Sequence, residues 1–167
     1  APELVVKAEI ATEFDMLGVG VDLSAGTKEK NDYTVMVLGG RIDDRIHIID
    51  YRRLRVMGNL EKLDAMKELL NDWSVIGQDD RGNYFPTYST CDIWSEAVQY
   101  QASLEADFKR VCLNQDNLYN LIWHPVKGFR ADKLARFRGI MGLFEDRKIV
   151  FNRFRNFTTM FEELTNF

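Results

Sequence analysis

One carboxylate stands out because of where the sequence places it. Asp22 lies inside the run Gly-Val-Gly-Val-Asp-Leu-Ser-Ala-Gly at 18–26, which otherwise holds the apolar and small residues of a buried strand. An ionised carboxylate is very costly to bury unless it is paired or binds a metal ion. The pattern therefore predicts a partner for Asp22, and a divalent cation is a candidate.

A second carboxylate, Glu96, follows another strand-like segment at 91–95. If the two strands lie side by side and parallel, both carboxylates reach the same edge of the sheet. Carboxylate oxygens and water are the ligands that Mg²⁺ and Mn²⁺ prefer, and two such ions about 4 Å apart can clamp a scissile phosphate. The spacing leaves a second interpretation open: Asp22 as a turn residue, and Glu96 as an N-terminal helix residue favoured by the helix dipole.

The charge distribution points to a polyanion at one surface. The chain of 167 residues has a net charge of −4, yet nine basic residues stand against three acidic ones between 127 and 155. A locally basic surface on an acidic protein suits a polyanion, although a solvated set of helix charges is the other interpretation. Arginine and lysine contact phosphates without reading sequence. The best candidates for DNA-phosphate contacts are Lys127, Arg130, Lys133 and Arg136.

The composition excludes several classes of protein. Two cysteines and two histidines, without ligand-like spacing, predict neither a disulfide scaffold nor a zinc site. His124, next to Pro125, is interpreted as a structural residue. No apolar stretch is long enough to span a membrane, and no signal peptide is visible. The chain starts without Met, so we expect it to be excised from a longer protein.

The periodicity predicts one mixed α/β domain over 1–167, with 1–17 as a lead-in segment. Alternating helices and strands after three consecutive strands are typical of a mixed sheet. We expect five strands, three antiparallel and then parallel ones, with helices on both faces. The predicted strands are 18–24, 33–38, 45–51, 91–95 and 118–123, and the predicted helices are 59–73, 97–111, 134–144 and 157–164. A long polar loop is expected at 77–90, and a short extended piece at 149–151.

Four motifs, in the right order, resemble the nuclease domain of the large terminase subunit of tailed bacteriophages. The resemblance covers nearly the whole chain. The motifs are Gly-Val-Asp-Leu-Ser-Ala-Gly at 20–26 with Asp-Tyr-Thr at 32–34, Trp-Ser-Glu-Ala-Val-Gln-Tyr-Gln at 94–101, Ala-Asp-Lys-Leu-Ala-Arg at 131–136 leading to Phe-Glu-Asp-Arg-Lys-Ile-Val-Phe at 144–151, and Phe-Glu-Glu-Leu-Thr-Asn-Phe at 161–167.

The resemblance implies an RNase H-like fold and a metal-dependent endonuclease that cuts concatemeric viral DNA during genome packaging. Asp22 and Glu96 match the family's first two catalytic residues, which bind Mg²⁺ or Mn²⁺ in a two-metal site. Asp32 matches a supporting acidic position. The family's third carboxylate would follow Phe167, where this sequence stops, so we expect a chain extended past this residue to bind metal and cut DNA better.

The same resemblance implies the partners and the location. The partners would be double-stranded viral DNA, the ATPase domain of the same protein, the portal and the small terminase subunit, with no membrane involved. The location would be the cytoplasm of the infected host cell, at the procapsid portal. No Gly-x-x-x-x-Gly-Lys-Ser/Thr phosphate loop occurs in this sequence, so the ATPase is not in this chain. Another RNase H-like nuclease, of the resolvase or transposase type, and a non-catalytic docking module of the packaging motor remain alternatives.

Overall fold

The computed structural model describes residues 6–8, 14–22, 33–55, 58–97, 101–127 and 146–160. Strands predominate, with two α-helices and one π-helical segment. In chain order the elements are β1 (Val6–Ala8), β2 (Met16–Asp22), β3 (Thr34–Ile42), β4 (Arg45–Leu54), α1 (Asn59–Asp72), β5 (Ile76–Gln78), β6 (Tyr84–Pro86), β7 (Cys91–Ala97), α2 (Gln101–Phe108), η2 (Lys109–Gln115), β8 (Leu121–Lys127) and β9 (Ile149–Asn152).

The main sheet is mixed, and its strands follow the order β1-β9-β4-β3-β2-β7-β8. β2 pairs with β7, and β7 with β8, in parallel. A two-residue turn, Asp43 and Asp44, joins β3 to its neighbour β4, and only antiparallel strands can be joined so tightly. The predicted mixed α/β fold is thereby confirmed. The sheet has seven strands where five were expected, because β1 and β9 add to it.

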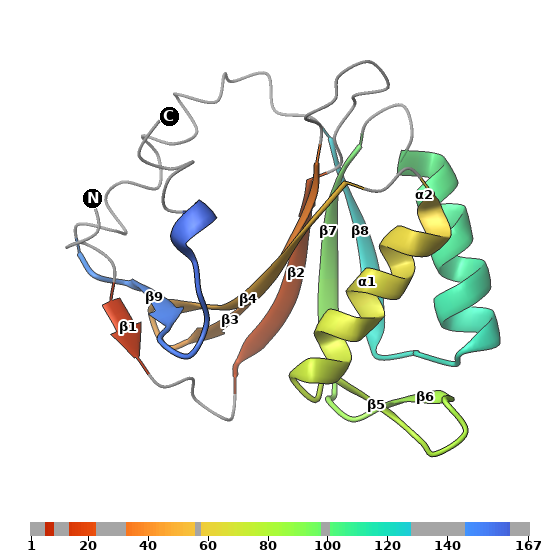
Figure 1. Cartoon of the computed structure of the whole chain (residues 1–167), viewed down its shortest axis with the longest axis horizontal. Coiled ribbons are helices and arrows are strands. Elements are labelled where there is room, and N and C mark those ends of the chain that lie inside the picture. The colour runs from red at the N-terminus through yellow and green to blue at the C-terminus, as the bar shows by residue number, and fades with distance from the viewer. Residues whose placement is uncertain are drawn as a thin grey trace. The chain divides into compact units, whose positions relative to one another are not determined.

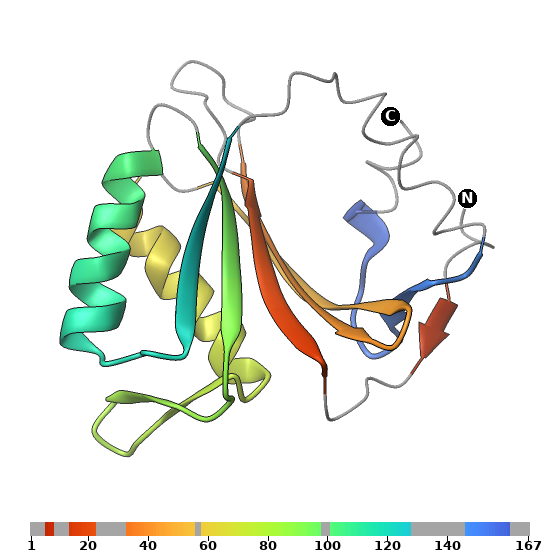
Figure 2. The same cartoon turned by 180° about the vertical axis from the view of Figure 1, so that it is seen from behind.

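The chain divides into two compact units. The larger consists of residues 17–38 and 51–128, and the smaller of residues 1–16, 39–50 and 129–167. In the larger unit, α1 and α2 lie side by side on one face of β2, β7 and β8 (Figures 1 and 2). The Asn59 side chain links the two helices, donating hydrogen bonds to Ser103 Oγ at 2.9 Å and Asp107 Oδ2 at 3.0 Å.

Helix α1 follows the apolar spacing of its sequence. Its buried apolar side chains recur at helical intervals and are Leu63, Met66, Leu69 and Leu70. One charged side chain, Lys67, is buried with them, and its Nζ lies 2.8 Å from Asp116 Oδ2. Burial alone would lower the pKa of Lys67, but the hydrogen bond and charge of Asp116 outweigh this and raise it. The helix is thus anchored by apolar packing and by one buried ion pair.

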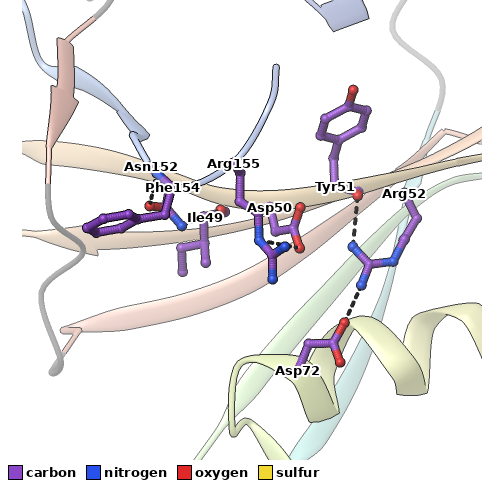
Figure 3. A network of polar contacts seen from close by, with 8 residues as sticks. All are labelled: Ile49, Asp50, Tyr51, Arg52, Asp72, Asn152, Phe154 and Arg155. Atoms are coloured by element: carbon purple, nitrogen blue, oxygen red, sulfur yellow. Dashed lines mark hydrogen bonds and ion pairs between the residues drawn. The ribbon is translucent and has the colours of Figure 1, made fainter. Parts of the chain in front are cut away.

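The smaller unit contains strand β9, which lies between β1 and β4 and pairs with both in parallel. Its last residue, Asn152, is fully buried and donates a hydrogen bond from Nδ2 to the Ile49 carbonyl at 3.2 Å. The buried carboxylate of Asp50 lies 3.5 Å from Arg155 Nε (Figure 3). These polar contacts tie the end of β9 to β4.

Three elements differ from the sequence prediction. The expected loop at 77–90 contains a hairpin, apart from its first residue Ile76, and in this hairpin β5 and β6 pair antiparallel. The strand expected at 118–123 runs instead over Leu121–Lys127, so it passes through Pro125. Proline is tolerated there because β8 is an edge strand, where a missing N–H leaves no ladder bond broken.

Two predicted helices lie wholly or partly outside the described residues. The helix expected at 134–144, which would cover the second face of the sheet, lies outside the described residues. Of the helix expected at 157–164, residues 157–160 are described, and 158–160 are helical. The single domain and the 1–17 lead-in segment stay predictions. No helix in the described ranges is both long and apolar enough to cross a bilayer.

Candidate metal centre

The structure brings the positions of Asp22 and Glu96 together. Strands β2 and β7 are parallel neighbours, and their register pairs Val21 with Ser95. One further step along both strands pairs Asp22 with Glu96. Both positions therefore lie at the carboxyl ends of adjacent parallel strands, where side chains from neighbouring strands meet. The side chain of Asp22 is exposed.

Strand alternation places Asp22 on the face opposite α1 and α2. Trp123 of β8 packs its ring against Phe108 of α2, with centroids 4.9 Å apart, so Trp123 faces the helices. Trp123 is in register with Ile93, and Ile93 with Val19, and both of these are fully buried. Successive side chains point to opposite faces. The face opposite α1 and α2 therefore carries Gly18, Gly20 and Asp22 from β2, and the register positions of Asp92, Trp94 and Glu96 on β7 and of Ile122, His124 and Val126 on β8. We call it the helix-free face, because no helix among the described residues covers it.

A stacked aromatic pair lies on this face beside the carboxylates. The rings of Trp94 and His124 are 4.1 Å apart and 14° from coplanar. His124 Nε2 also lies 2.7 Å from Asp92 Oδ1, which fixes the imidazole in place. Trp94 is 41% exposed, so one side of the pair faces solvent. Sequence reasoning missed this cluster and took His124 as merely structural. The alternating positions of Asp92, Trp94 and Glu96 indicated that these residues share one face of the strand. Which residue of β8 lies beside them depends on the register between β7 and β8, which the sequence does not reveal.

Two glycines leave the part of β2 before Asp22 without side chains on this face. A side chain at Gly18 would place its Cβ 3.0 Å from the Asp92 carbonyl oxygen and 3.6 Å from Trp94 Nε1. At Gly20, no atom of the described residues lies within 4 Å of the Cβ position. The part of β2 next to Asp22 therefore carries no side chains at Gly18 and Gly20 that would hinder a broad ligand.

The predicted DNA-contact residues and the predicted supporting residue lie largely outside the described part of the chain. Asp32, Arg130, Lys133 and Arg136 lie outside the described residues. Lys127 is the last residue of β8, and the structure describes its backbone, which pairs with Ala97. Their predicted roles stay predictions.

The donor chemistry at the strand ends fits Mg²⁺ or Mn²⁺. Asp22 offers an exposed carboxylate, and the Glu96 position is level with it on the next strand. Both ions prefer such oxygen ligands and complete their coordination with water. Within the described ranges, no three His, Cys, Asp or Glu side chains gather closely enough to hold a metal ion together. Two carboxylates with water are thus the donor set to test.

The sequence matches the model of the Terminase RNaseH-like domain family over residues 19–167. The chain belongs to this family. No curated protein matches the sequence. The match includes both Asp22 and Glu96, and it begins inside β2, the strand that carries Asp22.

Solved structures share the fold of this terminase-family chain. One is the nuclease domain of human cytomegalovirus terminase, soaked with Mn and bound to an inhibitor, with a TM-score of 0.65, 13% identity, and coverage of 91% of this chain and 75% of that one. Another is the nuclease domain of the large terminase from bacteriophage SPP1 with bound Mn, with a TM-score of 0.53, 15% identity, and coverage of 97% and 76%. The RNase H-like fold is therefore confirmed.

The chain is shorter than a complete large terminase. A large terminase from a thermophilic bacteriophage, in complex with ADP, gives a TM-score of 0.60 at 12% identity. The match covers 99% of this chain but only 35% of that one. At these identities the likeness carries the fold, and the roles of individual residues have to be argued from this chain's own geometry.

Proposed function

We propose that this chain is a metal-dependent DNA endonuclease that cuts concatemeric viral DNA during genome packaging. The observation that carries the proposal is the level pairing of the Asp22 and Glu96 positions at the ends of β2 and β7. The two positions are far apart in sequence, and only this register makes them neighbours. Family membership supports a nuclease role for that pair.

Asp22 and Glu96 would hold the catalytic Mg²⁺ or Mn²⁺ ions. A bound ion would polarise the scissile phosphate and lower the pKa of the attacking water. Asp22 is exposed at the strand end and so can reach both an ion and a substrate. The part of β2 without side chains at Gly18 and Gly20 would admit the DNA backbone beside it. Asp32 would support the site, and Lys127, Arg130, Lys133 and Arg136 would contact phosphates.

The partners follow from the family. This nuclease would act together with an ATPase domain of the same protein, the portal and the small terminase subunit, on double-stranded viral DNA. It would work in the cytoplasm of the infected host cell, at the procapsid portal. The match to about a third of a large terminase supports the first of these partners, because it leaves room for another domain in such a protein.

Cleavage of supercoiled plasmid tests the proposal. The chain should nick and linearise the plasmid with Mn²⁺ or Mg²⁺ and should be inactive in EDTA. The substitutions Asp22→Asn and Glu96→Gln should each lower the rate at least about 100-fold, since removing a residue that only hydrogen-bonds to a metal ligand already costs about 10- to 100-fold in activity or metal affinity. Titration calorimetry with Mn²⁺ should show weaker binding for both variants, which gives a readout independent of activity.

Matched controls make the same chemical change elsewhere. Asp80→Asn in the β5–β6 turn and Glu68→Gln on α1 each neutralise an exposed carboxylate and should leave the rate unchanged. Activity that survives Asp22→Asn would refute the assigned centre. Cleavage confined to branched DNA would favour the resolvase type. A chain that neither cuts nor binds DNA with either metal would favour the docking module.

A further inference from the structure

A second feature of the helix-free face lies at the ends of β3 and β4. Tyr33, just before β3, has the guanidinium of Arg53 over its ring, with 3.6 Å from Cζ to the ring centroid. The guanidinium of Arg55, just after β4, lies 5.2 Å from the same centroid. Both arginines are exposed, and Tyr33 is half-buried. One aromatic ring thus holds two cationic groups side by side, and we name these three residues the arginine clamp.

The arginine clamp lies on the same face as Asp22. Arg52 reaches the other way, because it pairs with Asp72 of α1 on the helix side. Figure 3 shows Tyr51 and Arg52 pointing to opposite sides of β4. Alternation then places Arg53 with Tyr51 on the helix-free side. Asp22 faces that side too, so the clamp and the candidate metal centre open onto one surface.

The arginine clamp also lies at the same edge of the sheet as Asp22. Strands β2, β4, β7 and β8 all end at this edge, in both views of the fold (Figures 1 and 2). One strand, β3, separates β4 from β2, and two strand spacings amount to about 10 Å. Phosphates of one DNA strand recur every ~3.4 Å along the helix axis, so this span corresponds to a few base-pair steps.

The chemistry of the clamp suits an oxyanion such as phosphate. Guanidinium presents N–H donors in a fixed fork that matches phosphate oxygens. Stacking on an aromatic ring restricts the side chain before a ligand arrives, so less conformational entropy is lost on binding.

We propose that Arg53 and Arg55, held by Tyr33, bind a DNA backbone phosphate a few steps away from the scissile one. This inference rests on the proposed nuclease function and deepens it. The DNA would cross the strand ends in the order β4, β3, β2 and β7, with the clamp holding one side of the cleaved bond. The clamp would position substrate and would not take part in the chemical step.

Binding measured without cleavage tests the clamp. A short fluorescently labelled duplex is titrated with the protein in EDTA, at several salt concentrations, and anisotropy is followed. The double substitution Arg53→Gln and Arg55→Gln should weaken binding about 10-fold or more at low salt. It should also reduce the slope of log affinity against log salt by between about one and two, because each lost phosphate contact removes close to one counterion.

Two further variants separate charge from positioning. Tyr33→Leu keeps both charges but removes the ring, so we expect weaker binding with an unchanged salt slope. Arg81→Gln, an exposed arginine in the β5–β6 turn, controls for net charge and should change binding little. Urea unfolding of each variant checks the fold. Glutamine keeps the aliphatic part of the side chain, which favours folding of the double variant.

The outcomes distinguish this inference from the proposed function. If the wild-type chain cuts plasmid but the double variant binds duplex as well as Arg81→Gln does, the clamp is refuted and the nuclease stands. If the double variant loses affinity with no change in salt slope, the clamp is also refuted, because losing its two arginines must remove phosphate contacts and change that slope. If the wild-type chain neither cuts nor binds DNA, the nuclease proposal itself fails.

Discussion

Ser95 directly precedes the candidate metal ligand Glu96 on β7 and is level with Val21 on β2, and we predict that removing its hydroxyl stabilises the protein. Its side chain is fully buried, with 0% exposure. Its register neighbours are Val21 on β2 and Pro125 on β8, and neither side chain can accept or donate a hydrogen bond. Among the described residues, nothing pairs with Ser95 Oγ. The hydroxyl therefore loses its water on folding and gains no partner within the part of the chain that the structure describes.

The expected size follows from two opposing effects. Burying a hydroxyl without a partner costs about 1–3 kcal/mol in proteins. Ser95→Ala removes that cost but leaves a space of one atom, which costs on the order of 0.5–1 kcal/mol, as for a lost methyl group. The net gain is about 1 kcal/mol, which for a protein of this size raises the melting temperature by roughly 2–4 °C.

Urea unfolding followed by circular dichroism measures this effect. Ser103→Ala is the matched control, because Ser103 Oγ accepts a hydrogen bond from Asn59 at 2.9 Å. That variant should lose about 0.5–1.5 kcal/mol, the net value of one hydrogen bond. A loss of stability of 1 kcal/mol or more in Ser95→Ala would refute the reasoning, since it would mean that the hydroxyl has a partner. Plasmid cleavage should be unchanged, because Ser95 faces the helices.

Three further predictions concern the same unit. Asp116→Ala should cost about 2–4 kcal/mol, because it removes the carboxylate nearest to the buried charge of Lys67 and leaves the more distant Asp64, at 3.8 Å, and the Tyr84 ring, at 4.9 Å. Lys67→Met should cost less, because the remaining carboxylate is partly solvated, and urea unfolding ranks the two variants. The pKa of Lys67 is raised in the folded protein, so its ion pair with Asp116 stabilises the fold fully below about pH 10. That contribution is lost as the pH rises past the usual lysine pKa of 10.5. The free energies of unfolding of wild type and Lys67→Met should therefore converge at such high pH. Gly18→Ala should destabilise the protein by about 1–3 kcal/mol, because its Cβ would lie 3.0 Å from a backbone oxygen of β7. Gly20→Ala meets open space and should be neutral in thermal unfolding.

The sequence predicted those elements whose residues carry a local signal. Helix α1 was found because its apolar residues recur at helical spacing, and β2 because small and β-branched residues precede one carboxylate. The neighbouring positions of Asp22 and Glu96 followed from strand order alone. That inference needed only that β2 and β7 be adjacent and parallel, which a mixed sheet of this order makes the natural arrangement.

The features that the sequence did not predict depend on contacts between residues far apart in the chain. Strand β1 has three residues and pairs with β9, more than 140 positions away, and no local pattern announces such a pairing. The stack of Trp94 on His124 requires the register between β7 and β8, and Pro125 concealed the continuation of that strand. The arginine clamp likewise joins residues about 20 positions apart that meet only when β3 and β4 pair.

The register that builds the candidate site is set by residues that take no part in its chemistry. A slip of one residue between β2 and β7 would turn every side chain of the shifted strand to the other face. Val19 and Val21, now buried, would face solvent, at about 1.5–3 kcal/mol each. Asp22 would turn toward the helices, where an unpaired carboxylate is far more costly. Burial of these valines on the side of the helices therefore fixes the positions of the carboxylates, so variants of this core should disturb metal binding without contacting the ion.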